Sequence, residues 1–455
     1  MCKLGAFNDD TVTLNDTVTV EDTVTVLVHS HGGGVLGWND AGSSDPGAAR
    51  RMTISGAWRR TARGAGLLAD DGSVAASIFA EMSALAARTG ALNLGQGFPD
   101  EDGPPEVLEA AQRAIRDGVN QYPPGRGMPV LRAAIAGHQK RFYGLDLDAD
   151  SEILVTAGAT EALAATLLAL LEPGDEVVTF EPFYDAYGGL IALAGGIHRT
   201  VPLRAPGSVT ETFQPDLDVL RAAVTDKTRL ILVNDPHNPT GAVFTAETLT
   251  LIVELAHRHD ALIVTDEVYE HLTFGARHIP ISTLPGAWER TVTISSGGKT
   301  FSTTGWKVGW LSGPAALVTA ILAVKQFLTY VNGAPFQPAM AVGLDLPDSY
   351  FSGIAAVLKA KRDTLATGLT RAGFTIALPQ GSYFIVADAR PVGYTDGAQF
   401  CRALPGLAGV VAVPISAFCS PDHRAEYASL VRFAYCKTTD VLTRAAANLA
   451  TLSPA

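Results

Sequence analysis

Basic residues, cysteines and long apolar runs are all scarce in this chain. Its 34 lysines and arginines are outnumbered by 46 aspartates and glutamates, which gives a net charge of −12 and a pI near 5.3. A nucleic acid or an anionic membrane would require a basic face, so neither is an expected partner. No uninterrupted apolar run reaches the ~18 residues that cross a bilayer, and the N-terminus lacks a signal-peptide pattern. We therefore expect a soluble, cytoplasmic protein.

The four cysteines are too few and too scattered for a disulfide framework or a metal site. They lie at positions 2, 401, 419 and 436, without the short spacings of metal ligands. We expect free and mostly buried thiols, and no metal.

A chain of 455 residues is too long to fold around one hydrophobic core, and its 47% apolar content is enough for more than one. We therefore expect two domains plus additional sequence. Within residues 1–72, positions 10–27 hold the period-six repeat DTVTLN-DTVTVE-DTVTVL, and residues 29–51 are rich in Gly, Ser and Asp. This composition cannot bury a core, so we expect a poorly ordered extension, and Met52 is a candidate natural start. Residues 73–120 are expected to join a smaller α+β domain at 331–455, and residues 121–330 to form the larger domain.

Strands alternate with helices through the larger domain. Apolar strands are predicted at 153–156, 230–234, 261–265 and 291–294, with a helix opening at Gly158 and another running from Thr245 to about His257. This alternation predicts an α/β fold, with a mostly parallel sheet flanked by helices. Ligands of such sheets bind at the carboxyl ends of the strands. The polar residues expected at those ends are Asn238, Asp266, Tyr269 and Lys299.

The stretch TVTISSGGKTFSTTGWKVGW, residues 291–310, is predicted to form a strand, a turn of small residues and then Lys299. A ligand can approach a lysine closely in such surroundings, and a lysine amine can form an imine with an aldehyde. Asp266 would be costly to bury unpaired, and a protonated pyridine nitrogen would be a suitable partner. Tyr269 and Asn238 can both donate hydrogen bonds to a phenolate oxygen.

An anion site and a ring-stacking residue complete the pattern. The helix opening at Gly158-Ala159-Thr160 offers N–H groups to a phosphate, together with Ser296 and Lys307. Tyr184, in FEPFYDAY, can stack on a flat ring. An aldehyde, a pyridine nitrogen, a phenolate, a phosphate and a ring face together describe pyridoxal 5′-phosphate.

Each of these residues also has an ordinary structural explanation. Asp266 could cap a helix, Tyr269 could be a core residue, and Asn238 lies in a favourable turn sequence. Lys307 could be solvated, and Tyr184 could pack in an interface. Their joint placement at strand ends favours the cofactor site over this set of separate explanations.

Several segments resemble those of class I/II aminotransferases of fold type I: NLGQGFPD, VNDPHNPTG, VTDEVYEHL and SGGKTFSTTGWKVGW. The resemblance covers roughly residues 73–452 and extends to the branch that holds kynurenine, glutamine and methionine transaminases. The strings NQYPPG, GAPFQPA, ARPVGY and PISAFC are most similar to actinobacterial N-succinyldiaminopimelate aminotransferases. The resemblance therefore implies an amino-acid and 2-oxo-acid substrate pair, with N-succinyldiaminopimelate as the first candidate.

The resemblance also implies roles for individual residues. Lys299 would be the Schiff-base lysine and proton shuttle, Asp266 the pyridinium partner, and Asn238 and Tyr269 the ligands of the ring oxygen. Tyr184 would stack on the ring. The implied phosphate ligands are Gly158, Ala159, Thr160, Ser296 and Lys307, and many relatives have arginine in place of the last.

Three further residues follow from the same resemblance. Tyr122, in NQYPPG, matches a tyrosine that reaches the phosphate of a neighbouring subunit, which implies a homodimer with shared sites. Arg432, in SLVRFAYCK, matches the arginine that binds the substrate α-carboxylate, where a planar guanidinium is better suited than a lysine. Gly97 would add a backbone contact. Arg126 is a candidate for a distal carboxylate, with a solvated loop arginine as the alternative.

The implied mechanism is ping-pong transamination, in which Lys299 moves a proton of the bound amino acid. A cysteine-conjugate β-lyase would use the same residues and remains an alternative. A transcription regulator would need a basic helix-turn-helix segment, which the acidic N-terminus does not offer. A non-catalytic binding module is the third alternative.

Overall fold

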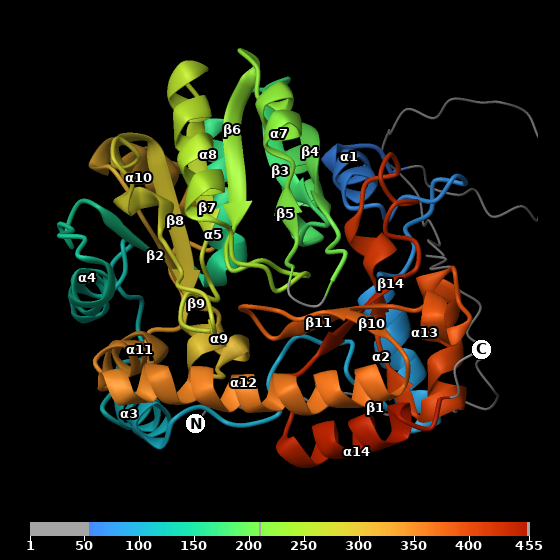
Figure 1. Ribbon diagram of the computed structural model, residues 1–455. Helices are drawn as coiled ribbons and strands as arrows, with labels where there is room; N and C mark the ends of the chain where they lie inside the picture. Colours follow the sequence, from blue (N-terminus) through green and yellow to red (C-terminus); the bar gives the residue numbers. More distant parts are fainter. Residues whose placement is uncertain (1–53, 209–210, 453–455) are drawn as a thin grey trace, which may run out of the picture. The chain divides into compact units, whose positions relative to one another are not determined.

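The computed structural model describes residues 54–208 and 211–452, and its central feature is an eight-stranded sheet (Figure 1). The strand order is β2-β9-β8-β7-β6-β3-β4-β5. The inner strands β4, β3, β6, β7 and β8 run parallel, whereas β2, β9 and β5 pair antiparallel to their neighbours. The strands are β2 (Ile153–Ala157), β3 (Glu176–Glu181), β4 (Ile197–Arg204), β5 (Gln214–Pro215), β6 (Thr228–Asn234), β7 (Leu262–Asp266), β8 (Thr291–Ser296) and β9 (Val308–Ser312).

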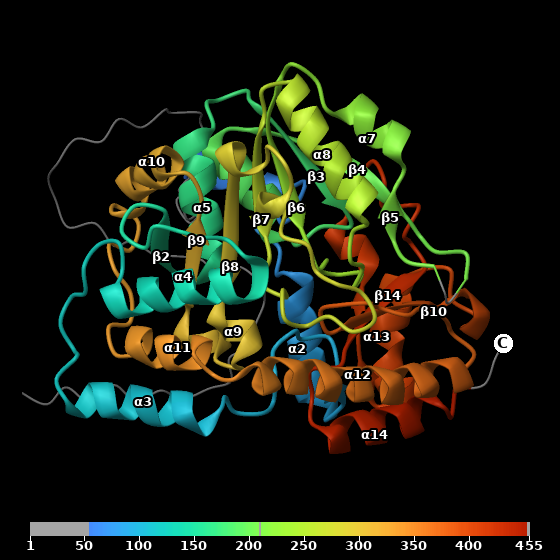
Figure 2. The same ribbon diagram turned by 60° about the vertical axis from the view of Figure 1, so that its left-hand side comes forward.

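Helices cover both faces of this sheet because successive strand residues point to opposite sides. In β6, Leu230 and Leu232 belong to the core that packs under α5, α6 and α10, whereas Ile231 and Val233 belong to the core shared with α8. Helices α4 and α11 cover β2 and β9 (Figure 2). These helices are α4 (Pro129–Tyr143), α5 (Gly158–Leu170), α6 (Ala186–Ala194), α8 (Ala246–Arg258), α10 (Ala315–Lys325) and α11 (Phe336–Leu344); α7 is Leu217–Ala223.

A smaller antiparallel sheet with the order β10-β11-β14-β13 is built from the C-terminal part of the chain. The long helix α12 packs against α14 through a close contact of Gly368 with Ala446. The elements are α12 (Asp348–Arg371), β10 (Thr375–Ala377), β11 (Phe384–Asp388), α13 (Gly397–Ala408), β12 (Val410–Val411), β13 (Val413–Pro414), β14 (Leu430–Ala434) and α14 (Thr439–Leu449).

The segment before the large sheet contacts this C-terminal part. Strand β1 (Leu92–Asn93) pairs in parallel with β12, and α2 (Ile78–Thr89) packs against α13. Helix α3 (Pro105–Arg116) has a proline at its first position, where no backbone donor is needed, and packs against α11. Residues 56–455 form one compact unit that contains both sheets.

The repeat and Met52 lie outside the described residues, but a helix lies within the stretch that was expected to be poorly ordered. Helix α1 (Ala57–Gly64) packs against α6, where Gly64 meets the backbone of Gly188. Arg60 donates hydrogen bonds to the carbonyls of Ala192 and Leu193 at 2.9 and 3.1 Å. The expectation that the chain is poorly ordered up to residue 72 is therefore wrong for residues 57–64.

Other expectations can be compared directly. Thr245 caps α8, since its hydroxyl accepts a hydrogen bond from the N–H of Thr248. Ser295 and Ser296 continue β8, and Lys299 lies in the one-turn helix α9 (Gly297–Thr300), so the predicted turn at 295–298 is wrong. Cysteines 401, 419 and 436 are free and buried. Within 54–208 and 211–452, no helix is long and apolar enough to span a membrane.

Candidate active site

A cavity of about 330 Å³ opens at the carboxyl ends of the parallel strands, between the two sheets. It brings together every predicted site residue except Tyr122 and the candidate Arg126. The predicted residues that line it are Gly97, Gly158, Ala159, Thr160, Tyr184, Asn238, Asp266, Tyr269, Ser296, Lys299, Lys307 and Arg432.

Lys299 projects from α9, directly after β8. Position 297, two residues before it, is a glycine, and a Cβ there would lie 1.9 Å from Met340 Sδ. The Lys299 Nζ donates to the Gly97 carbonyl at 3.4 Å and lies 5.8 Å from the Tyr269 ring centroid. Burial lowers the pKa of Lys299 from 10.5 to about 8, although the nearby Asp266 carboxylate opposes this shift. The structure therefore holds a lysine that loses its proton more readily than a solvated one.

Asp266 ends β7 with its carboxylate deep in the cavity. Burial raises its pKa to about 6, and a hydrogen bond from Tyr187 opposes that shift. The Tyr187 hydroxyl donates to Asp266 Oδ2 at 2.8 Å. Asp266 has no ion-pair partner within 4 Å among the residues that the structure describes, so a buried cation would be a suitable ligand.

Tyr269 and Asn238 lie on loops that follow β7 and β6. Asn234 fixes both loops: its Oδ1 accepts from the Asn238 N–H at 2.7 Å, and its Nδ2 donates to the Asp266 carbonyl at 2.8 Å. Tyr269 is only 3% exposed, and burial raises the pKa of its phenol. At neutral pH the Tyr269 hydroxyl is thus a hydrogen-bond donor facing the cavity.

The N-terminus of α5 forms an anion-binding corner with Lys307. Gly158 has φ 74°, and a Cβ on it would lie 3.2 Å from Lys307 Nζ. Gly309 in β9 lies so close that its Cβ would be 2.7 Å from the Ala159 nitrogen. Lys307 Nζ donates to Thr160 Oγ1 at 3.4 Å. The positive end of a helix and an ammonium group together favour a phosphate here.

Arg432 extends from β14 into the opposite side of the cavity. Its Nη1 donates to Asn238 Oδ1 at 3.0 Å, and its Nη2 donates to the Gly95 carbonyl at 2.8 Å. The guanidinium packs over the Phe384 ring at 4.1 Å, and burial lowers the pKa of Arg432 to about 10. Among the described residues no carboxylate pairs with it and its Nε has no partner. A buried, unpaired guanidinium suits a carboxylate ligand.

Tyr184 also lines the cavity, and burial raises its pKa to about 12. Its ring meets that of Tyr187 edge-on at 5.6 Å. By contrast, Arg126 does not line the cavity; it donates to the Ser151 carbonyl and to Thr319. Tyr122 is 83% exposed, and its ring lies 5.8 Å from that of Tyr330.

Tyr187, Asn234 and Phe384 also line the cavity, although they were not predicted from the sequence. Asn234 ends the apolar strand β6 in the same way that Asp266 ends β7, so its place at a strand end could have indicated it. Tyr187 is the last residue of FEPFYDAY, but its role depends on its tertiary contact with Asp266.

Comparison with known proteins places these observations in a family. Residues 89–449 match the model of the family described as aminotransferase class I and II. A relative from Mycobacterium tuberculosis, described as "Probable N-succinyldiaminopimelate aminotransferase DapC", is 52% identical over 386 residues, covering 83% of this chain and 96% of the relative. A kynurenine–oxoglutarate transaminase of Dictyostelium discoideum is 38% identical, covering 82% of this chain and 93% of the relative.

A solved structure agrees with the sequence comparison. The N-succinyldiaminopimelate aminotransferase from Mycobacterium tuberculosis superposes with a TM-score of 0.81 at 53% identity. The match covers 83% of this chain and 98% of that one.

Proposed function

The chain belongs to the class I and II aminotransferases, and on that basis we propose that it transfers an amino group between N-succinyl-LL-diaminopimelate and 2-oxoglutarate, with pyridoxal 5′-phosphate as cofactor. The observation that carries this substrate assignment is the 52% identity over 386 residues with the Mycobacterium tuberculosis relative. The cytoplasmic location remains a prediction from the sequence.

The residues in the cavity fit the proposed cofactor. Asp266, buried without a cation, would hold the pyridine nitrogen, and Lys299 would bind the aldehyde carbon. Asn238 and Tyr269 would hold the ring oxygen, and Tyr184 would contact the ring face. Gly158, Ala159, Thr160, Ser296 and Lys307 would bind the phosphate. When bound, the cofactor supplies an aldehyde for the amino group and a protonated ring that withdraws electrons from the bond being broken.

Two residues then act on the amino acid. Arg432 binds the α-carboxylate with its two terminal nitrogens, and Gly97 lies beside the same position. As a free amine, Lys299 Nζ accepts the α-proton of the amino donor. Its ammonium group then gives the proton up again within the same half-reaction. The lowered pKa of Lys299 makes this free amine available near neutral pH.

The pKa of Lys299 gives a first prediction, on uptake of pyridoxal phosphate by the cofactor-free protein. Only the neutral amine attacks an aldehyde, so the uptake rate should rise with pH below 8 and level off above about pH 8. Stopped-flow absorbance measures this rate, with N-acetyl-lysine amide in the same buffers as the control, since its pKa is about 10.4. A protein rate that keeps rising to pH 10 in parallel with the control would contradict the assignment.

Tyr187→Phe removes the hydrogen bond that stabilises ionised Asp266. The pKa of Asp266 should rise, and the acidic limb of the pH–kcat profile should move to higher pH. A hydrogen bond to a charged group is worth about 1.5–3 kcal/mol, or roughly 1–2 pKa units. Starting from a pKa of about 6 for Asp266, kcat at pH 7 should fall roughly two- to fifteenfold. Tyr394→Phe, which lies outside the cavity, is the matched control. An unchanged acidic limb would argue that Tyr187 only packs.

The proposed homodimer leads to a prediction about surface residues. Large apolar side chains are exposed near Tyr122: Phe327 is 82% exposed, Leu328 44% and Tyr330 48%. We expect a second copy to cover this patch and Tyr122 to reach its phosphate. Light scattering should therefore give twice the 47.6 kDa chain mass. Phe327→Glu should yield monomers with little activity, whereas Leu407→Glu, at another exposed apolar position, should not. A monomeric parent protein would contradict the shared site.

The second candidate is the kynurenine-type branch, supported by the 38% identical Dictyostelium relative. Enzymes of this chemistry can also eliminate a β-substituent. Incubation with cystathionine in the absence of a 2-oxo acid distinguishes β-elimination from transamination. Steady release of pyruvate and ammonia would favour the lyase, whereas a single half-reaction that stops without an acceptor supports transamination.

A further inference from the structure

Three metal-binding side chains meet in the interior outside the active-site cavity. His138 lies on α4, and Glu270 and His271 directly follow Tyr269 in the turn after β7. One ligand atom from each lies within 4.8 Å of the others. The Nε2 atoms of the two histidines are 2.6 Å apart. Two imidazoles and one carboxylate are a common ligand set for Zn²⁺.

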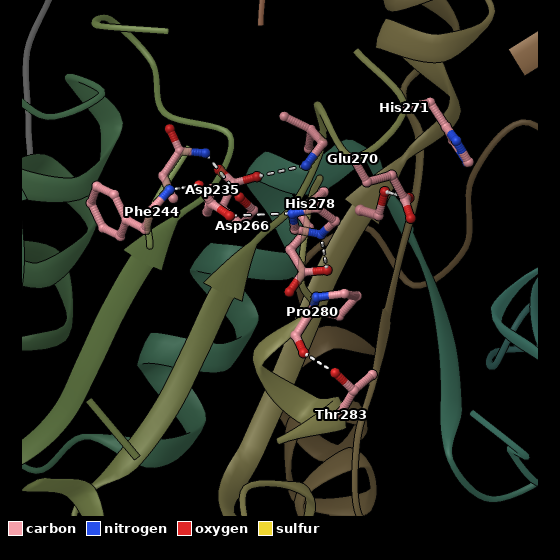
Figure 3. Close-up of polar contacts among 12 residues, drawn as sticks. Asp235, Phe244, Asp266, Glu270, His271, His278, Pro280 and Thr283 are labelled. Atoms are coloured by element: carbon pink, nitrogen blue, oxygen red, sulfur yellow. Dashed lines mark hydrogen bonds and ion pairs between the residues drawn. The ribbon is translucent and has the colours of Figure 1, made fainter. Parts of the chain in front are cut away.

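Glu270 is one of three carboxylates buried near His278. Figure 3 shows the contact of His278 with Asp235, and Glu270 and His271 on the other side of His278. His278 pairs with Asp235 at 3.2 Å and with Glu267 at 2.9 Å, so one imidazolium serves two carboxylates. Glu270 adds a third buried carboxylate, which has no ion-pair partner in the described part of the chain.

The hydrogen bonds of Glu270 leave one oxygen available. Its Oε1 accepts from the Ser295 hydroxyl at 2.6 Å. Its Oε2 has no partner in good hydrogen-bond geometry among the described residues, although the Tyr143 hydroxyl lies beside the carboxylate as a donor. A buried carboxylate oxygen without a partner is costly, and a metal ion would satisfy it. Ser295 would then orient the ligand from outside the metal shell.

The two histidines face each other and have few other polar partners. His138 is buried, and its Nδ1 has no hydrogen-bond partner among the described residues. Arg141, on the same helix, is paired with Asp348 at 3.3 Å. His271 is partly exposed.

We propose that His138 Nε2, His271 Nε2 and Glu270 form a Zn²⁺ site that ties α4 to the turn carrying Tyr269. In tetrahedral zinc sites with Zn–N of about 2.0–2.1 Å, two nitrogens lie about 3.3 Å apart. The imidazoles therefore have to separate by less than about 1 Å. A water molecule completes the coordination.

Metal content of the holoenzyme tests the site. His29 and His31, outside the described residues, could also bind zinc, so the background protein carries H29Q and H31Q. After chelator treatment and equilibration with Zn²⁺, mass spectrometry should find one zinc ion per chain in the background protein. H138Q and H271Q should each lose this ion, whereas H257Q should retain it, because His257 only bonds the Gly286 carbonyl.

Thermal unfolding gives an independent measurement. Zinc at 100 times its Kd should raise the Tm of the background protein by roughly 5 °C and leave that of H271Q unchanged. Absence of zinc from the background protein would overturn the proposal and leave a hydrogen-bonded imidazole pair. The same holds if H138Q and H271Q each retain as much zinc as the background protein. If H138Q does not fold, H271Q and the Co²⁺ spectrum of the background protein decide, since tetrahedral Co²⁺ absorbs strongly in the visible range and Co²⁺ in water absorbs weakly.

Discussion

Replacing Lys299 with alanine should lower the transamination kcat by roughly 10⁴-fold, the largest effect of any single substitution in this chain. Two lysines line the cavity: Lys307 contacts Thr160 at the α5 corner, whereas Lys299 lies beside the Tyr269 ring. The Lys299 Nζ is the group proposed to bind the cofactor and to move the substrate proton. The variant should still bind pyridoxal phosphate through Asp266 and the α5 corner. It should lose the visible absorbance of a lysine-bound cofactor.

Lys140→Ala is the matched control, because Lys140 is an exposed lysine paired with Asp146 at 2.8 Å. It should keep both activity and absorbance. An alanine variant at 299 that keeps the lysine-bound absorbance would show that another lysine binds the aldehyde.

Arg432→Lys should lower kcat/KM for amino-acid donors by about 10²-fold or more. The substitution keeps a positive charge but loses the planar pair of N–H donors, and charge-assisted hydrogen bonds are worth about 1.5–3 kcal/mol each. It also removes the contacts with Asn238 and the Gly95 carbonyl. Steady-state kinetics with an amino-acid donor and with its decarboxylated amine separate the loss of carboxylate binding from the loss of these internal contacts.

The loss should be confined to donors that carry an α-carboxylate. Arg402→Lys is the control, since Arg402 pairs with Glu81 on the surface and lies outside the cavity. Equal losses for the amino acid and for the amine would mean that Arg432 acts on the fold and does not bind the carboxylate.

Sequence alone predicted the parallel part of the large sheet because its strands are continuous apolar runs. Leu230–Asn234 is a clear example, since both of its faces are buried by helices. It did not predict β9, a short strand that contains Gly309 and pairs antiparallel to β8. It also did not predict α1, an arginine-rich helix whose position depends on the contact between Gly64 and Gly188. Such contacts are set by tertiary packing and leave no local pattern.

The site was more predictable than the fold. Asp266, Lys299 and Asn238 follow strands, so their convergence follows from the parallel topology. Arg432 comes from the other sheet, and only the resemblance to a family indicated that it would reach the cavity. Tyr187 could not be found, because its hydrogen bond to Asp266 joins a helix to a strand across 79 positions.

The central claim concerns the amino donor, and a comparison of kcat/KM values tests it most directly. N-succinyl-LL-diaminopimelate, methionine, kynurenine and glutamine would each be assayed as donors with 2-oxoglutarate as acceptor. We predict that the succinylated donor has a kcat/KM at least tenfold above that of every other donor. A higher value for methionine, kynurenine or glutamine would contradict the substrate assignment and leave the aminotransferase family unchanged.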